Sequence, residues 1–234
     1  MCSNFQPIKT EHAEWVEEQF GCPLPQAPWR AETYPTYPAP FVYLQDGKPK
    51  CDLAQFGLVT HWAEDKKKFG LRTYNARSET VHEKPSYRHA WKERQFGLAI
   101  MESFYEPCWE TGKAIRWRIK RTDMQPIAVP SIWERFIDKE TREVIFSFSM
   151  LTVNADGHSI MKHFHKLEDE KRSIIVLVEA DYRLWLKASH EQVRSLLKVA
   201  PDNFLISEAT PLILAELNID LKTSGKLRKI RMKR

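Results

Sequence analysis

Glycine is scarce in this sequence: eight of its 234 residues are glycine. So few glycines leave little room for a glycine-rich segment that could form an oxyanion hole from backbone N–H groups. Long apolar runs are also absent, since nothing resembles a transmembrane segment and the N-terminus lacks the apolar core of a signal peptide. There is no internal repeat and no low-complexity linker. We therefore expect one continuous domain in a soluble, cytoplasmic protein.

Paired cysteine motifs are missing too. The four cysteines (Cys2, Cys22, Cys51 and Cys108) show no C-x-x-C spacing. In a reducing compartment such residues remain free thiols, so we expect no disulfide framework.

Excess positive charge is confined to one end of the chain. The formal net charge is +5, yet residues 222–234, KTSGKLRKIRMKR, hold seven basic residues and no acidic one. The remainder has 29 basic residues against 31 acidic ones. Any phosphate-binding surface on the body must therefore be a local patch. The tail is interpreted either as a polyanion-binding arm or as a solvated end.

The middle of the sequence is rich in β-like runs. Residues 114–120, AIRWRIK, alternate so that Arg116, Arg118 and Lys120 share an exposed cationic face of a half-buried strand. Further strands are predicted at 41–44, 56–62, 126–133, 143–153 and 173–178. Helices are predicted at 10–20, with Thr10 as the cap and Gly21 as the stop, at 75–95 with a break before Pro85, and at 189–201, where Ser189 and Gln192 form a capping box.

The fold class that follows is α+β. We expect a single domain with a largely antiparallel, curled or barrel-like β-sheet and peripheral helices. Hydrophobic residues make up 42% of the chain and charged residues 29%, as in ordinary globular proteins.

The cysteine at position 2 has a chemical interpretation beside chance. If Met1 is removed, Cys2 becomes the N-terminus and carries an amine and a thiol on adjacent carbons. Their unperturbed pKa values of about 8 and about 8.5 leave part of both groups nucleophilic near neutral pH. This 1,2-aminothiol can act as an N-terminal nucleophile, or it can condense with an aldehyde to a five-membered thiazolidine.

Three short stretches place polar residues in apolar surroundings. Asn75 follows a strand-like stretch in NARSET, and Glu106 lies beyond the run LAIMESFY. His163 and His165, in SIMKHFHK, would share one face of a strand. An amide, a carboxylate and an imidazole at strand ends can form a buried reaction centre. Each residue taken singly is equally well explained by an ordinary structural role.

The run from FGLVTHW to ESFYE resembles the SOS-response-associated peptidase (SRAP) family. The carrying motifs are NARSET, followed by KPSYR and then by SFYE, together with the second-position cysteine. The resemblance implies the SRAP fold. We assign residues 1–221 to an SRAP-like domain and 222–234 to the basic tail.

The resemblance implies a role for each matching residue. Cys2, freed of Met1 by the protein's own activity, would capture the aldehyde of an abasic site in single-stranded DNA as a thiazolidine. Asn75 would hold the N-terminal residue, Glu106 would transfer protons, and His165 would help to open the sugar. A weak strand-cleaving lyase activity would be a side reaction.

DNA contacts are implied as well. Arg77 and Arg88 match arginines on the DNA backbone, and Trp62 matches an aromatic residue that stacks on bases. We expect a monomer associated with the nucleoid, a role in the DNA damage response, no cofactor, no metal and no membrane partner.

The sequence departs from the family pattern at several positions. Ser3 and Asn4 replace a glycine and an arginine, Phe56 and Pro107 replace tryptophans, and KLEDEK separates His165 from the next arginine. The last departure leaves His163 open as the alternative catalytic histidine.

Three other functions remain open at this point. An N-terminal-nucleophile amidohydrolase would also use Cys2, although the scarcity of glycine is unfavourable for its oxyanion hole. A non-catalytic DNA-binding module would use only the arginines and the tail. A metal site could draw on residues that cluster in sequence, namely His158, His163, His165, Glu168, Asp169 and Glu170.

Overall fold

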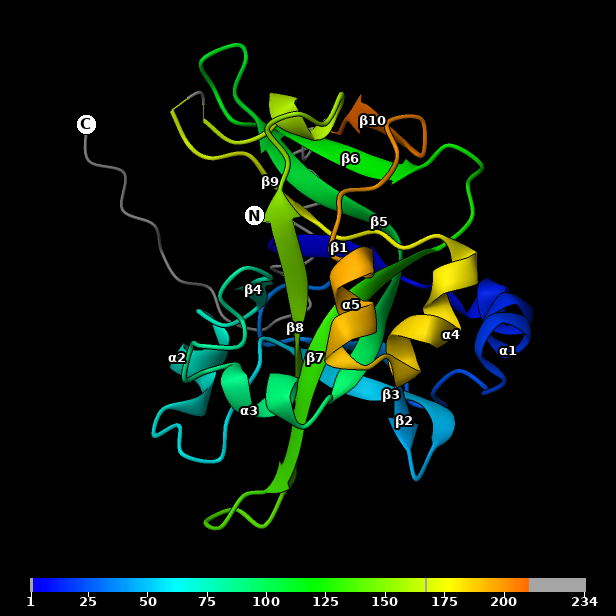
Figure 1. Ribbon diagram of the computed structural model, residues 1–234, viewed down its shortest axis with the longest axis vertical. Helices are drawn as coiled ribbons and strands as arrows, with labels where there is room; N and C mark the ends of the chain where they lie inside the picture. Colours follow the sequence, from blue (N-terminus) through cyan, green and yellow to red (C-terminus); the bar gives the residue numbers. More distant parts are fainter. Residues whose placement is uncertain (1, 167, 211–234) are drawn as a thin grey trace, which may run out of the picture.

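A computed structural model describes residues 2–166 and 168–210 of the chain (Figure 1). Its strands are β1 (Asn4–Pro7), β2 (Pro38–Gln45), β3 (Lys48–Phe56), β4 (Asn75–Arg77), β5 (Phe96–Cys108), β6 (Ile115–Arg121), β7 (Ile127–Ile137), β8 (Val144–Asn154), β9 (Arg172–Ile174) and β10 (Leu205–Ala209). Its α-helices are α1 (Ala13–Phe20), α2 (Lys66–Gly70), α3 (Arg88–Lys92), α4 (Glu179–Lys187) and α5 (His190–Leu196). Two short 3₁₀ helices are η1 (Thr10–His12) and η2 (Met161–His163).

Five strands close into a barrel. β5 pairs with β2, β2 with β3, β3 with β8, β8 with β7, and β7 returns to β5. Only the β3–β8 pair in this circuit is parallel. The other strands extend the circuit: β1 and β6 pair with β5, β10 with β6, and β4 and β9 with β8. The predicted α+β fold with a barrel-like sheet is confirmed.

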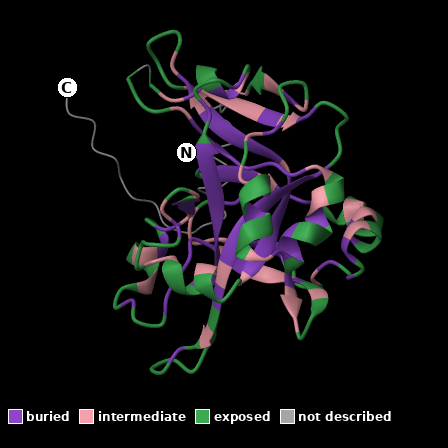
Figure 2. Ribbon diagram, in the orientation of Figure 1, coloured by how far each residue is buried: buried purple, intermediate pink, exposed green. Residues whose placement is uncertain are grey.

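Strand β5 and most of β2, β7 and β8 are buried on both faces, as Figure 2 shows for the central arrows. Along β5, Leu98 and Ile100 belong to one apolar cluster while Ala99 and Met101 belong to another. This alternation follows from the two-residue period of a strand. The second cluster fills the barrel, where the ring of Phe148 stacks on those of Phe41 and Phe56 at 4.7 and 5.4 Å. A rigid interior therefore supports the strand ends.

Helices α1, α4 and α5 cover one side of the barrel (Figure 1). Trp185 of α4 is fully buried there and donates its Nε1–H to the carbonyl oxygen of Gly97 at 2.8 Å. Ser189 caps α5 and forms the predicted capping box with Gln192. Gly21 ends α1 in the left-handed conformation, also as predicted, whereas Thr10 lies in η1 and is not a cap.

Two predicted elements around the NARSET stretch are wrong. The segment 56–62 is not a strand, because β3 ends at Phe56 and Gly57, at φ +111°, takes the chain out of the sheet. The segment 75–95 is not a broken helix. Asn75–Arg77 pair in parallel with β8, a series of turns follows, and only α3 is helical. Pairing with a distant strand overrides local helix propensity at this point.

The strand prediction for 173–178 is only partly right, because β9 ends at Ile174. β6 confirms the strand predicted at 114–120. The basic side chains on its predicted cationic face form ion pairs with acidic side chains. Arg116 bonds Glu32 at 2.7 Å, and Arg118 and Lys120 both contact Glu208. The acidic partners come from other segments of the chain, which alternation within one strand cannot reveal.

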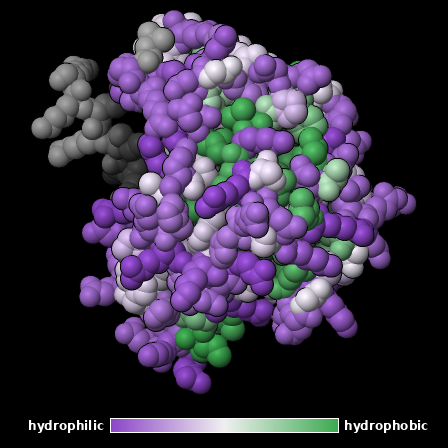
Figure 3. All heavy atoms as spheres, in the orientation of Figure 1, coloured by the Kyte–Doolittle hydropathy of each residue, from purple (hydrophilic) through white to green (hydrophobic). Residues whose placement is uncertain are grey.

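The surface in Figure 3 is mainly hydrophilic on the side shown, but hydrophobic residues are visible across its upper and right-hand part and again at the end of the β7–β8 hairpin. Ile137 and Val144, which oppose each other there, are both exposed. Within the described residues no helix is long and apolar enough to cross a membrane. The predicted domain limit at residue 221 and the basic tail lie outside the described residues.

Candidate functional site

The N-terminal strand brings Cys2 to the end of β5. Asn4 and Phe5 pair with Tyr105 and Phe104 in antiparallel register, so the residues before Asn4 continue toward Glu106. Cys2 is fully buried, and its thiol donates to the carbonyl oxygen of Asn4 at 3.5 Å. All four cysteines of the chain are buried free thiols.

Asn75 holds the Cys2 backbone. Its Nδ2 donates to the carbonyl oxygen of Cys2 at 2.7 Å, across 73 residues of sequence. Asn75 itself is fixed by the pairing of β4 with β8, opposite Met150, and by Tyr87, whose hydroxyl donates to the Asn75 carbonyl oxygen at 3.0 Å. The side chain of Asn75 is thus presented to Cys2 from a buried strand.

Glu106 lies within β5 and is almost completely buried. Burial raises its pKa from 4.5 to about 7, because the charged carboxylate is poorly solvated in the interior. Near neutral pH comparable fractions of Glu106 are protonated and ionised. A group in that condition can both give and take a proton.

His165 lies against Glu106, with Nε2 3.5 Å from Oε2. Burial lowers the pKa of His165 from 6.5 to about 4. Between pH 4 and 7 the contact therefore joins a neutral imidazole to a neutral carboxyl group. The backbone of His165 is held in the left-handed region, at φ +68°, and its N–H donates to the Pro107 carbonyl oxygen at 3.1 Å. That hydrogen bond anchors the histidine to the strand that carries Glu106.

The same cluster changes the acidity of two further groups. The pKa of the Cys2 thiol is raised, first by burial and then by the charge of Glu106. The pKa of Tyr74 is raised by burial, by Cys2 and by Glu106. Tyr74 was not predicted as a site residue; its position immediately before Asn75 is the one signal that could have pointed to it.

The prediction that His163 and His165 share a strand face is wrong. His163 ends η2, and its Nδ1 lies 2.5 Å from Glu110 at the surface. His158 is turned elsewhere, because its Nδ1 accepts hydrogen bonds from the backbone N–H groups of Ile160 and Met161. The three histidines thus go to three different partners. Across residues 2–166 and 168–210 no group of three potential ligands is arranged to hold a metal ion.

A surface pocket of about 370 Å³ includes His165 in its lining. It is lined by Trp109, Glu110, Asp156, Lys162, His163, His165 and Lys171. Of the four residues Cys2, Asn75, Glu106 and His165, only His165 lines this pocket. A larger pocket of about 500 Å³ is separate from it and shares none of its lining residues.

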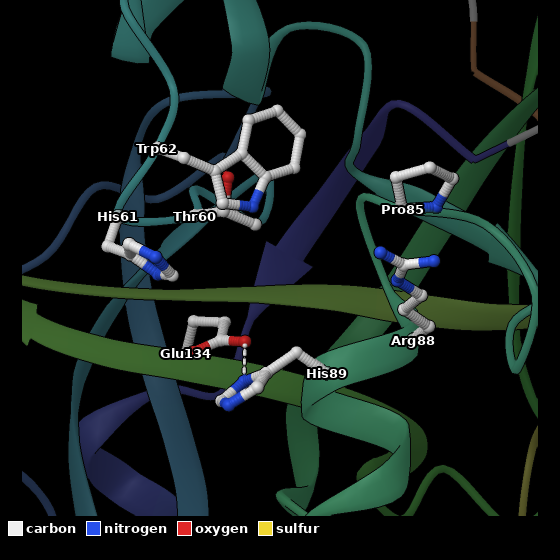
Figure 4. A pocket seen from close by; sticks show the side chains of 7 residues that line it. All are labelled: Thr60, His61, Trp62, Pro85, Arg88, His89 and Glu134. Carbon is white, nitrogen blue, oxygen red and sulfur yellow. Dashed lines mark hydrogen bonds and ion pairs between the residues drawn. The ribbon is translucent and has the colours of Figure 1, made fainter.

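The three residues predicted to bind DNA come from three segments: Trp62 from the loop after β3, Arg77 from β4 and Arg88 from the start of α3. Arg77, half exposed, is paired with Glu170 at 2.8 Å. Trp62 and Arg88 line the larger pocket, facing each other across it in Figure 4. Arg88 has no ion pair with any of the residues described, so of the two arginines it is the one available to a phosphate.

The departures from the family pattern have local roles. Asn4 accepts a hydrogen bond from Arg116 at 2.8 Å and donates to Glu32 and to the carbonyl oxygen of Thr33. Phe56 contributes an aromatic ring to the barrel interior. These substitutions therefore belong to the packing around the site.

Comparison with known proteins gives a consistent family relationship. The sequence profile described as SOS response associated peptidase (SRAP) matches residues 1–211. Abasic site processing protein YoqW from Bacillus subtilis (strain 168) is 25% identical over 150 residues, 62% of this chain and 62% of that protein. The protein of the same name from Bacillus phage SPbeta matches equally. Abasic site processing protein YoaM from Bacillus subtilis is 26% identical over 149 residues, 61% of this chain and 60% of YoaM. The match thus spans less than two thirds of the length of these curated relatives.

Solved structures show the same fold over nearly the whole chain. A crystal structure of a protein from Bordetella bronchiseptica is 29% identical, with a TM-score of 0.81 over 90% of this chain and 100% of that one. A protein from Bacteroides thetaiotaomicron is 19% identical, with a TM-score of 0.74 over 89% of this chain and 91% of that one. The second likeness is one of fold alone.

Proposed function

This chain belongs to the SOS response associated peptidase (SRAP) family, and from that premise we propose that it processes abasic sites in DNA by covalent capture at Cys2. The observation that carries the proposal is the hydrogen bond from Asn75 to the Cys2 carbonyl oxygen in a buried cluster with Glu106 and His165. The names of the relatives YoqW and YoaM agree with this activity.

The first step is hydrolysis of the Met1–Cys2 peptide bond. Water adds to the Met1 carbonyl carbon, the C–N bond breaks, and the nitrogen of Cys2 leaves as an amine with the proton that it needs. Glu106 is suited to take the proton from water and return it to the amine because its pKa, raised by burial, lies near 7. Asn75 keeps the Cys2 carbonyl in place during this step.

The second step is capture of the ring-opened sugar of an abasic site. The amine of Cys2 attacks the aldehyde carbon C1′, and the resulting carbinolamine loses water to give a Schiff base. Glu106 protonates the departing hydroxyl, and His165 assists ring opening as an acid–base group. The thiol of Cys2 then adds to the C=N carbon while its proton passes to the nitrogen, and a thiazolidine results. A fraction of Schiff base that undergoes β-elimination would cleave the strand as a lyase does.

Single-stranded DNA is the substrate that we propose. Arg88 would contact the backbone and Trp62 would stack on a base. Arg77 would reach a phosphate after leaving Glu170. The chain would act as a monomer, near the nucleoid, in the response to DNA damage, without a cofactor.

The decisive experiment mixes the protein with a single-stranded oligonucleotide that carries one abasic site. We expect a covalent, heat-stable protein–DNA band on a denaturing gel without reductant, and no such band for Cys2→Ala. Intact mass must first show that Met1 is absent. No band from folded, processed protein would refute capture, and glutamine hydrolysis by the same sample would favour an amidohydrolase. DNA binding that is indifferent to Cys2→Ala would favour a non-catalytic module.

A further inference from the structure

The larger surface pocket, next to α3, has features that the capture chemistry does not use. Its volume is about 500 Å³, within the range of small-molecule sites. It lies between the loop after β3 and the start of α3, and Figure 4 shows its side chains converging from both. The lining residues are Thr60, His61, Trp62, Pro85, Arg88, His89 and Glu134.

Trp62 lines two pockets. The residue is 50% exposed, and its ring stands at 89° to that of Phe69, with 5.1 Å between the centroids. The second of these pockets also measures about 500 Å³ and includes Phe69 and Arg72. A half-exposed indole that lines a pocket can stack on a flat ring bound there.

The larger pocket also contains a carboxylate. Glu134 of β7 has a side chain only 9% exposed, and its Oε1 lies 2.8 Å from Nδ1 of His89. Figure 4 shows this contact below Trp62. A carboxylate at that place repels a phosphate but accepts hydrogen bonds from a neutral donor such as an amino group.

A third pocket, next to the one that contains Glu134, is lined by basic residues and by no acidic one. It measures about 450 Å³ and is lined by His82, Arg88, His89, Trp91, Lys92 and His190, with no acidic residue among them. Arg88 and His89 line both hollows. A nucleotide spanning the two could place its phosphate on the basic side and its base on the acidic side.

We propose that the pocket of Trp62 and Glu134 binds one unstacked nucleobase of the DNA strand next to the abasic site and selects a base with an exocyclic amino group. The base stacks on the Trp62 indole, its amino group donates to Glu134, and its phosphate lies against Arg88. Cytosine is preferred over thymine, because thymine presents a carbonyl oxygen where cytosine presents an amino group. The presence of DNA at this surface rests on the proposed function.

The test measures binding of undamaged, fluorescently labelled 12-mers of dC and dT by anisotropy, with the Cys2→Ala protein so that no covalent step intervenes. We expect about tenfold tighter binding of the dC oligomer, as one good base contact provides. Glu134→Gln should bring the two affinities within about twofold, because a Gln amide both donates and accepts hydrogen bonds. Glu93→Gln, which removes the same charge from the end of α3 without lining this pocket, should retain the preference.

Further outcomes separate the possibilities. The base-selective pocket would be overturned if the Cys2→Ala protein bound dC and dT with equal affinity. It would also be overturned if the preference for dC persisted in the Glu134→Gln variant. If Glu134→Gln does not fold, as judged by circular dichroism, Trp62→Ala replaces it, and it should weaken binding of dC more than binding of dT. If the protein prefers dC but the wild type does not capture abasic sites, the proposed function is refuted and the base-selective pocket is supported. If the wild type captures abasic sites but the protein binds dC and dT equally, the proposed function is supported and the base-selective pocket is refuted.

Discussion

At the scale of single residues, Glu106 and His165 affect stability in opposite directions with pH. Burial raises the pKa of Glu106 from 4.5 to about 7 and lowers that of His165 from 6.5 to about 4. The folded state therefore holds more protons than the unfolded state at Glu106 and fewer at His165. In the window shared by both shifts, about pH 4.5 to 6.5, the two contributions oppose each other.

Substituting Glu106 should expose the contribution of His165. The stabilising contribution of protonated Glu106 is present below pH 4.5 and lost as pH rises to 7, at a cost of about 3 kcal/mol. We expect Glu106→Gln to gain stability relative to wild type over that range, as measured by urea unfolding at pH 5 and pH 7.5. The wild type is destabilised at His165 as pH falls from 6.5 to 4, because the folded state resists protonation of the buried imidazole. The His165→Gln variant should not show this loss of stability. Glu18→Gln, at an exposed position, is the control, and an equal gain in that variant would contradict the assignment.

Asn75 should matter for the position of Cys2. Asn75→Ala removes the Nδ2 donor and leaves the buried Cys2 carbonyl oxygen without it, which costs about 1–3 kcal/mol. We expect capture of an abasic oligonucleotide to be slower by about 5-fold to 150-fold, since 1.4 kcal/mol corresponds to a factor of ten. Gel time courses measure the rate. Met1 removal, followed by intact mass, should slow as well, and a capture rate within twofold of wild type would show that the hydrogen bond is dispensable.

At the scale of elements, a glycine fixes the loop that carries Trp62. Gly57 has φ +111°, and a Cβ there would lie 2.3 Å from the carbonyl oxygen of Gly70 at the end of α2. Close packing of these two backbone segments sets where the loop leaves β3. The position of Trp62 therefore depends on the absence of a side chain at residue 57.

Gly57→Ala should both destabilise the chain and weaken DNA binding. Left-handed strain and the steric clash together are expected to cost about 3 kcal/mol. Gly47→Ala is the matched control, because Gly47 also has positive φ, at +75°, but a methyl group there would extend into open space. Urea unfolding and anisotropy with single-stranded DNA measure the two effects. If both variants weaken DNA binding equally, the close contact between Gly57 and Gly70 does not position Trp62.

At the scale of the whole molecule, charge is distributed unevenly. The cationic side chains of β6 are paired with Glu32 and Glu208, whereas the hollow beside α3 has no acidic residue in its lining. The excess of basic over acidic residues in the sequence lies in residues 222–234. Salt dependence of binding can separate the contribution of the tail from that of the folded surface.

Removing residues 222–234 should lower the salt dependence of single-stranded DNA binding. If all seven basic residues contact phosphates, the slope of log K against log salt should become shallower by about 5, and by less if only some do. Anisotropy titrations from low to moderate salt give the slope. Preference for dC over dT should persist in the truncated chain, because Glu134 is retained. An unchanged slope would mean that the tail does not contact DNA.

The sequence by itself determined the features that depend on residues close together in the chain. Alternation located the strand at 114–120, a β-like run located the strand at 143–153, and Gly21 and Ser189 marked helix ends. The NARSET and SFYE motifs identified Asn75 and Glu106 as candidate site residues. These features depend on neighbouring residues, whose spacing is visible in the chain itself.

Only the tertiary structure decided which of these residues meet. The Cys2–Asn75 hydrogen bond joins positions 73 residues apart, and β4 is a strand because it pairs with β8. His165, and not His163, lies against Glu106 because a 3₁₀ helix and a left-handed residue interrupt the expected strand. Glu134 had no motif to mark it. Strand pairing and burial join residues distant in sequence, and no local pattern specifies the register in which they do so.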